Sequence, residues 1–326
     1  MNFSSFLFKR FLAVLPLVFF LPLMTFVLMH YVPGNYFDSL RLNPQISPDT
    51  IKRYEELYHL NEPVLMQYGH WLKSILRLDF GYSFSYKQPV LNLLASRFWN
   101  TLALTGTSFL LAWFLAVALG LNAGLKRGGL LDKSCRLMAY LGLSIPGFFL
   151  CLLLMAAAAT WTRLPLGGME SALYEDLSFG HKILDRLSHM VIPVSVLTFS
   201  SFAYLFRFMR AQTLTVTEKD FVFYLRTLRV PERSILYKHV ARNAVNPMIT
   251  LFGLELPALF SGAALVEIFT GWPGLGSMML QAVRAQDLFL VLGNMMILSV
   301  LLVAGNLIAD ILLATLDPRI RLEGKS

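Results

Sequence analysis

Residues 110–119 read LLAWFLAVAL, a run with an apolar side chain at every position. A membrane-spanning β-strand would alternate apolar and polar residues over about ten positions, and this run has no polar face. In hydrocarbon every backbone N–H and C=O must be paired, which a helix achieves within one segment. The run therefore predicts a membrane-spanning helix, which its apolar neighbours extend to residues 101–125.

Five further stretches have the same character. A bilayer core about 30 Å thick needs roughly 20 apolar residues in a helix. The whole chain has 56% hydrophobic and 15% charged residues and a mean hydropathy of +0.58, which is too apolar for a water-soluble surface. We expect an all-α polytopic membrane protein with about six transmembrane helices, at residues 11–31, 101–125, 137–160, 187–206, 248–269 and 288–316.

The distribution of charge predicts the topology. Lys9 and Arg10 precede the first apolar stretch, so a cleaved signal peptide is the alternative to a retained helix. The stretch is longer than a signal-peptide core and lacks a small-x-small cleavage site, which favours a retained helix. Most of the 28 Lys and Arg residues would then share the side of the N-terminus, which places both termini in the cytoplasm. The net charge of +8 is explained by this topology and by contact with membrane lipid, and no soluble basic domain indicates nucleic-acid binding.

The spans divide the chain into four parts. We predict a cytoplasmic N-terminus with the first transmembrane helix (1–31), an external insertion subdomain (32–100), a five-helix core (101–316) and a cytoplasmic tail (317–326). In the insertion, Ser47-Pro48-Asp49 has the pattern of a helix start. Asn61-Glu62-Pro63 starts another helix, whose apolar residues from Val64 to Leu76 recur at intervals of three and four, as in a helix packed on one side.

A basic cytoplasmic segment, residues 207–247, interrupts the core. Residues 218–230 predict a short helix, and Pro231-Glu232 begins a second one that Pro247 is expected to stop. The second helix carries Leu236, Val240 and Ala244 at intervals of four. The residues alone leave two interpretations open: a helical pair lying on the membrane surface, or a platform on which another protein docks.

Six motifs occur in one order along the chain: LDFGYS (78–83), QPV (88–90), LSIP (143–146), RNA (242–244), WPGLG (272–276) and DPRI (317–320). Together they make nearly the entire chain resemble the inner-membrane permease subunits of bacterial ATP-binding cassette (ABC) importers for dipeptides, oligopeptides and nickel. The resemblance implies an ABC importer type I permease fold in the bacterial inner membrane. It also implies the partners: a homologous second permease subunit, two ATP-binding cassette ATPase subunits and an external solute-binding protein.

In such permeases a cytoplasmic helix fits a groove on the ATPase and transmits its closure. The resemblance places this coupling helix near residues 220–231. The candidate coupling residues are Asp220, Leu225, Thr227, Arg229, Val230 and Pro231. Leu225, Thr227 and Arg229 depart from the pattern, since the family usually has alanine, alanine and glycine there. The bulk and charge predict a narrow choice of ATPase partner.

Acidic residues in apolar spans suggest a pore or gate. Glu255 and Glu267 would each cost roughly 2.5 to 3.5 kcal/mol at a helix centre, so they should face the bundle interior or a wet cavity. They are candidate pore residues or, equally, interhelical hydrogen-bond partners, the role we favour for Asp310. Trp272, Pro273 and Gly274 follow the fifth span, where they predict a turn that anchors an external gate or a plain structural loop, with the tryptophan in the interfacial belt.

Other classes of function fit the sequence less well. The histidines lack His-Glu-x-x-His spacing and no Gly-x-Ser-x-Gly occurs, so we predict no enzyme, no catalytic residue, no metal site and no cofactor. ATP hydrolysis is expected in the partner subunits. A secondary, ion-coupled transporter and a non-transporting membrane scaffold remain the alternatives, although no inverted repeat supports the first. Peptide is the expected substrate, ahead of a nickel chelate or another small solute.

Overall fold

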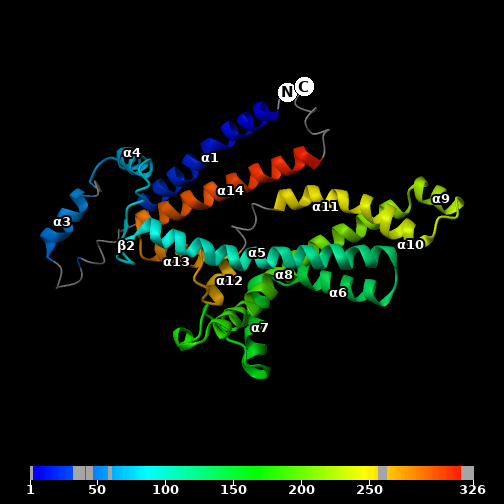
Figure 1. Ribbon diagram of the computed structural model, residues 1–326. Coiled ribbons are helices and arrows are strands. Elements are labelled where there is room, and N and C mark those ends of the chain that lie inside the picture. The colour runs from blue at the N-terminus through cyan, green and yellow to red at the C-terminus, as the bar shows by residue number, and fades with distance from the viewer. Residues whose placement is uncertain (1–2, 32–40, 42–46, 58–60, 256–262, 317–326) are drawn as a thin grey trace. The chain divides into compact units, whose positions relative to one another are not determined.

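The computed structural model describes residues 3–31, 41, 47–57, 61–255 and 263–316 (Figure 1). The DPRI motif at 317–320 and the predicted tail lie outside the described residues. The chain divides into two compact units. The smaller unit comprises residues 2–101 and 273–304, and the larger unit comprises residues 102–272 and 305–326.

The smaller unit begins with α1 (Phe3–Tyr31), which covers the first expected span. It also holds α3 (Pro48–Leu57), α4 (Val64–Ile75), the hairpin β1 (Tyr82–Ser83) and β2 (Gln88–Pro89), the first part of α5 (Val90–Leu125), α13 (Leu275–Arg284) and the first part of α14 (Leu288–Leu316). The two strands are antiparallel, with Tyr82 opposite Pro89. Both predicted helices of the insertion are confirmed, since α3 starts at Pro48 and α4 directly after Pro63.

Helix α4 packs against α1 through aromatic side chains. Tyr68 donates a hydrogen bond to the carbonyl oxygen of Phe19 (2.7 Å), and its ring lies 5.9 Å from that of Phe26. Trp71 is buried beside Tyr68. Leu65 and Leu76, which belong to the same predicted stripe, are exposed. Fewer side chains of α4 are therefore buried than the apolar stripe in its sequence predicts.

The larger unit is built from helices. After the rest of α5 come α6 (Leu130–Ser144), α7 (Gly147–Trp161), a 3₁₀ turn (Tyr174–Asp176), α8 (Phe179–Thr217), α9 (Asp220–Thr227), α10 (Glu232–Ser234), a π-helical turn (Ile235–Val240), α11 (Ala241–Glu255) and α12 (Ala264–Phe269). Among the described residues, α5, α8 and residues 288–311 of α14 are each long and apolar enough to cross a membrane.

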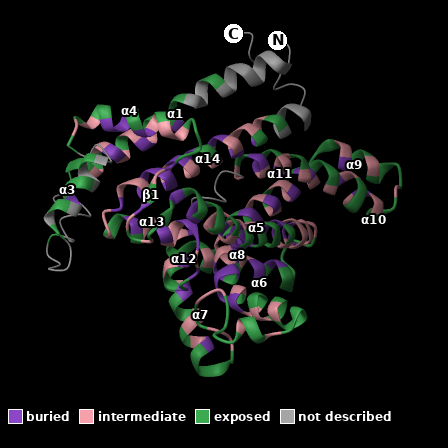
Figure 2. Ribbon diagram, turned by 60° about the vertical axis from the view of Figure 1, so that its left-hand side comes forward, coloured by how far each residue is buried: buried purple, intermediate pink, exposed green. Residues whose placement is uncertain are grey.

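The third expected span, residues 137–160, is broken into α6 and α7, whose axes differ by 111°. Pro146 has no backbone N–H, and its ring disfavours helical geometry at the residue before it. Ile145 is accordingly extended, with φ −95° and ψ 119°. As Figure 2 shows, exposed residues prevail on α7, where only Cys151 and Ala158 are buried. The pair counts as one span only if it is taken as bent.

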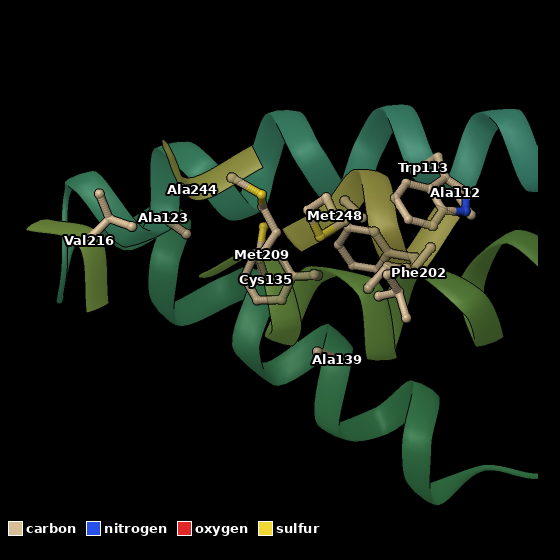
Figure 3. Packing of buried hydrophobic residues seen from close by; sticks show 14 of the residues in the cluster. Ala112, Trp113, Ala123, Cys135, Ala139, Phe202, Met209, Val216, Ala244 and Met248 are labelled. Atoms are coloured by element: carbon tan, nitrogen blue, oxygen red, sulfur yellow. The ribbon is translucent and has the colours of Figure 1, made fainter. Parts of the chain in front are cut away.

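A hydrophobic core joins α5, α6, α8, α9 and α11 (Figure 3). Small residues of α5 allow close approach to α8: a Cβ added at Gly120 would lie 2.8 Å from Cβ of Met209, and one added at Gly124 would lie 2.5 Å from Cβ of Thr213. Phe202 and Met209 of α8 are buried in this core. Helix α8 is thus the central element of the larger unit.

The second helix predicted in residues 207–247 differs from expectation in two ways. After α10 it continues as a π-helical turn, so Ile235 and Val240 share the buried face, while Leu236 is only partly buried. Pro247 lies inside α11 and does not stop it, so that prediction was wrong. A proline inside a helix costs roughly 3 kcal/mol. Burial of Ala244, Met248 and Leu251 on either side offsets this cost.

Candidate functional site

Helix α9 has one face in the core. Val222 is fully buried, and Phe221 and Leu225 are partly buried against the core that α5, α8 and α11 share. Asp220 lies in the first turn, where a carboxylate is favoured by the helix dipole. Leu225, one of the three positions that depart from the family pattern, therefore packs inward and its bulk is accommodated within the chain.

The other face of α9 carries exposed apolar side chains. Phe223, Tyr224 and Leu228 are 75%, 63% and 55% exposed. Thr227 is exposed beside them, and its hydroxyl donates to the carbonyl oxygen of Phe223 (3.1 Å). Exposed apolar groups rimmed by polar residues are typical of a surface that binds another protein or a membrane. We call these four residues the outer face of α9.

The end of α9 is a Schellman turn. Val230 N–H donates to the carbonyl oxygen of Leu225 (3.2 Å), and Arg229 N–H donates to that of Arg226 (2.9 Å). This turn requires a left-handed residue after the C-cap, a place usually taken by glycine. Arg229 occupies it with φ +56°. The backbone therefore has a conformation that glycine usually supplies, although the side chain is an exposed arginine.

An ion pair closes the turn that follows α9. Arg226 Nε and Nη2 donate to the two carboxylate oxygens of Glu232, at 3.2 and 2.7 Å. This hydrogen bonding lowers the pKa of Glu232 and raises the pKa of Arg226 from their ordinary values. Between them, the carbonyl oxygen of Pro231 accepts from Ser234 N–H (2.8 Å). The candidate coupling residues from Leu225 to Pro231 thus belong to the end of α9 and the capped turn that follows it, whereas Asp220 lies at the start of α9.

A hydrogen bond links this segment to α5. Tyr237, in the π-helical turn, donates through its hydroxyl to Oδ1 of Asn122 (3.0 Å). Asn122 in turn donates to the carbonyl oxygen of Ala118 within α5. The segment is therefore linked to α5 through this bond and to α8 through the π-helical turn, which packs against α8.

A cavity of about 500 Å³ lies among α5, α7, α8, α11 and α12. Its wall carries the hydroxyl groups of Thr105, Ser108, Ser200 and Ser201 together with apolar side chains, and Pro146 of the LSIP motif also lines it. Glu255 lines the same cavity, and among the described residues it is the one charged residue that does so. The structure therefore places Glu255, one of the two candidate pore acids, on the wall of this cavity, and its role in a pore stays a prediction.

Glu267 and Trp272 are buried. Glu267 is fully buried on α12, and its carbonyl oxygen accepts from Trp272 N–H (2.8 Å). Trp272 is 2% exposed and packs against Leu104 and Val194. The tryptophan thus lies in a protein core rather than in an interfacial belt, and neither residue lines the cavity with Glu255.

Pro273 and Gly274 lead into α13 in the smaller unit. Asn100 donates to the carbonyl oxygen of Pro273 (2.8 Å), and Thr101 Oγ1 accepts from Leu275 N–H (2.8 Å). Gly274 is the N-cap of α13 with an extended backbone, φ −106° and ψ −174°. The turn after Trp272 is therefore tied to the first part of α5 by two hydrogen bonds.

The sequence analysis did not identify two buried carboxylates, Asp287 and Asp132, that link separate elements by hydrogen bonds. Asp287 caps α14 and accepts from Ser83 Oγ (2.6 Å), Ser85 N–H (2.9 Å) and Ser85 Oγ (2.7 Å) in the hairpin. Asp132 on α6 accepts from Arg210 on α8. An aspartate directly before an apolar helix is a recognised cap signal, so the first could have been found. The second pairs residues 78 positions apart, and no local pattern marks it.

Known proteins resemble the chain over nearly its full length. Residues 3–105 match the N-terminal region of binding-protein-dependent transport system membrane components. The chain is 34% identical to the oligopeptide transport system permease protein AppB of Bacillus subtilis, over 97% of this chain and 99% of that protein. It is 33% identical to the oligopeptide permease OppB of Haemophilus influenzae (97% and 99%) and 28% identical to the metal-staphylopine import system permease CntB of Staphylococcus aureus (97% and 98%). Residues 116–322 match the binding-protein-dependent transport system inner membrane components, and the chain belongs to this family of ABC importer permeases.

Proposed function

We propose that this permease forms half of a pore that imports peptides, driven by two ATPase subunits that bind the segment around α9. A homologous second permease would complete the pore, an external solute-binding protein would deliver the peptide, and both termini would lie in the cytoplasm. The names of AppB and OppB support peptide as substrate, whereas that of CntB supports a metal chelate as the second candidate. The main support for ATPase coupling is the capped, left-handed turn at Arg229 beside the outer face of α9.

The outer face of α9 has the properties of a docking surface. Its aromatic residues Phe223 and Tyr224 are rigid and largely exposed, which suits them as anchors in a groove. The inner face packs against the π-helical turn Ile235–Val240, which in turn packs against α8 and α11. A force applied to the outer face is therefore transmitted to helices that line the cavity with Glu255.

Arg229→Gly tests the coupling turn. A left-handed backbone costs a non-glycine residue roughly 1 to 2 kcal/mol, so we expect the variant to be at least as stable as the parent. We also expect altered ATPase pairing, because the exposed guanidinium is lost. Thermal unfolding and the amount of ATPase that co-purifies from native membranes measure the two effects.

Arg229→Ala is the matched control, because it removes the charge but keeps the strain of a Cβ in the left-handed region. If charge selects the ATPase, both variants change the pairing, and only the glycine variant gains stability. Unchanged assembly and transport in both variants would contradict a role for Arg229 in partner choice.

Glu255 is proposed to contact the cargo in the cavity. A carboxylate among hydroxyl groups is suited to hold the ammonium group of a peptide. We expect Glu255→Gln to lower the rate of peptide uptake about tenfold or more, since a charge-assisted hydrogen bond contributes roughly 1.5 to 3 kcal/mol. The measurement is uptake of labelled di- and oligopeptides by proteoliposomes that contain the complete transporter.

Glu267→Gln is the comparison variant, since Glu267 does not line the cavity. It is expected to affect the yield of folded protein rather than the apparent affinity for peptide. Equal peptide uptake by the Glu255→Gln variant and the parent would remove Glu255 from the pathway. Uptake of a metal chelate and not of peptides would favour the second candidate, and uptake driven by an ion gradient without ATPases would favour a secondary transporter.

A further inference from the structure

A second cavity, of about 510 Å³, lies between α6 and α8 near the end of α8 from which α9 follows. Its wall combines arginine and aromatic side chains. They are Arg136 and Tyr140 of α6 and Tyr204, Arg207, Phe208 and Arg210 of α8. None of them lines the cavity that holds Glu255.

Positive charge is in excess at this second cavity. Among the described residues, Asp132 is the one carboxylate that forms an ion pair with any of these arginines, namely Arg210 and Arg136, and it is 1% exposed. Arg210 holds both of its oxygens, at 2.6 and 3.0 Å. The Nε of Arg136 lies 3.5 Å from Oδ1 of Asp132, is buried and has no hydrogen-bond partner. The cavity therefore keeps about two uncompensated guanidinium charges.

Arg207 is held in place without a carboxylate. Its guanidinium lies over the ring of Tyr140, with Cζ 5.8 Å from the ring centroid. Such a contact orients an arginine and leaves its N–H groups free to bind an anion. Arginine is the side chain whose planar donors match a phosphate best.

The borders of the cavity are apolar. Leu137 and Leu141 are 60% and 45% exposed on α6, next along the helix to Arg136 and Tyr140. Tyr204 on α8 is 46% exposed. In a membrane these exposed side chains face lipid tails, and tyrosine prefers the boundary between tails and headgroups. A soluble anion would use the guanidinium groups but would gain nothing from this apolar border.

We propose that the cavity between α6 and α8 binds the phosphate headgroup of an anionic phospholipid, whose acyl chains lie along Leu137 and Leu141. Basic pockets between transmembrane helices are known to bind such headgroups. The site would hold α6 against α8 at the level of the coupling segment, so the bound lipid would support the surface that the ATPase contacts.

The test uses the full chain, purified in a neutral detergent and titrated with phosphatidylglycerol or with phosphatidylcholine of the same acyl chains. Native mass spectrometry counts the bound lipids. The test variant is Arg136→Gln/Arg207→Gln. The control is Arg127→Gln/Lys133→Gln, which removes the same amount of charge, just before α6 and in its first turn, at residues that do not line the cavity.

We expect the parent and the control to bind phosphatidylglycerol equally and the test variant to bind it about 25-fold more weakly, since each of the two surface cations contributes roughly fivefold. Equal binding by test variant and parent, or equal affinity for phosphatidylcholine, overturns the proposal. Complete competition by glycerol phosphate assigns the cavity to soluble phosphates instead. Loss of the lipid when a second permease binds assigns it to a protein interface instead.

Discussion

Replacing Asp132 by alanine is expected to lower the free energy of unfolding by about 3 to 5 kcal/mol. Asp132 is buried and accepts hydrogen bonds from Arg210 Nε (2.6 Å), Arg210 Nη2 (3.0 Å) and Gly128 N–H (2.9 Å). Its loss leaves the guanidinium of Arg210, which is only 18% exposed, without an opposite charge. An unpaired charge in this position costs more than the ion pair itself contributes.

The same reasoning predicts a partial rescue. Removing both charges in Asp132→Ala/Arg210→Met should destabilise the protein less than Asp132→Ala alone, because the guanidinium of Arg210 is no longer left buried without an opposite charge. The exposed pair of Arg226 and Glu232 is the matched control: Glu232→Ala should cost at most about 1 kcal/mol. Thermal unfolding in detergent measures all three variants. The role assigned to burial would be contradicted if the losses of stability of the two single substitutions simply added in the double variant. It would also be contradicted if Glu232→Ala destabilised the protein as much as Asp132→Ala.

The membrane-spanning helices were predictable because hydrocarbon imposes a simple rule. A bilayer requires about 20 consecutive apolar residues, and α5, α8 and α14 show them in the sequence without ambiguity. Helix starts in the insertion followed from local signals, namely Pro48 and Pro63. Such features depend on neighbouring residues, which a single sequence displays.

The exceptions arise where the local conformational preference of a residue competes with packing between helices. Pro146 breaks the apolar stretch 137–160, whereas Pro247 is carried inside α11. Each proline has no backbone N–H to donate to a helical hydrogen bond. Their surroundings differ, because Met248 beside Pro247 is buried in the core, whereas the residues around Pro146 line a cavity. Propensity alone assigns both prolines the same effect.

A candidate-site residue was predictable where its position requires one particular backbone conformation. The resemblance pointed to glycine at position 229, and the structure shows a left-handed residue there. It did not reveal that Leu225 packs inward or that Trp272 is buried. Those facts depend on which side chains meet across α8, and so does the cavity of Arg136 and Arg207.

Gly124→Leu is expected to prevent close packing of α5 on α8 and to cost about 3 kcal/mol or more. Ala116, Gly120 and Gly124 recur at intervals of four on α5, and small residues at this spacing let membrane helices approach closely. A Cβ at Gly124 would lie 2.5 Å from Cβ of Thr213 and 3.1 Å from the carbonyl oxygen of Arg210. Neither atom is the end of a flexible side chain, so the helices must separate.

Gly106→Leu is the matched control on the same helix, since nothing lies within 4 Å of a Cβ at that position. It should leave stability unchanged or raise it by up to about 1 kcal/mol, because leucine favours helix more than glycine does. The yield of monodisperse protein and its unfolding temperature distinguish the two. In the lipid environment α5 and α8 gain little from hydrophobic burial, so contact between their backbones must supply the stability. Equal stability of the two leucine variants would show that α5 and α8 associate through other contacts.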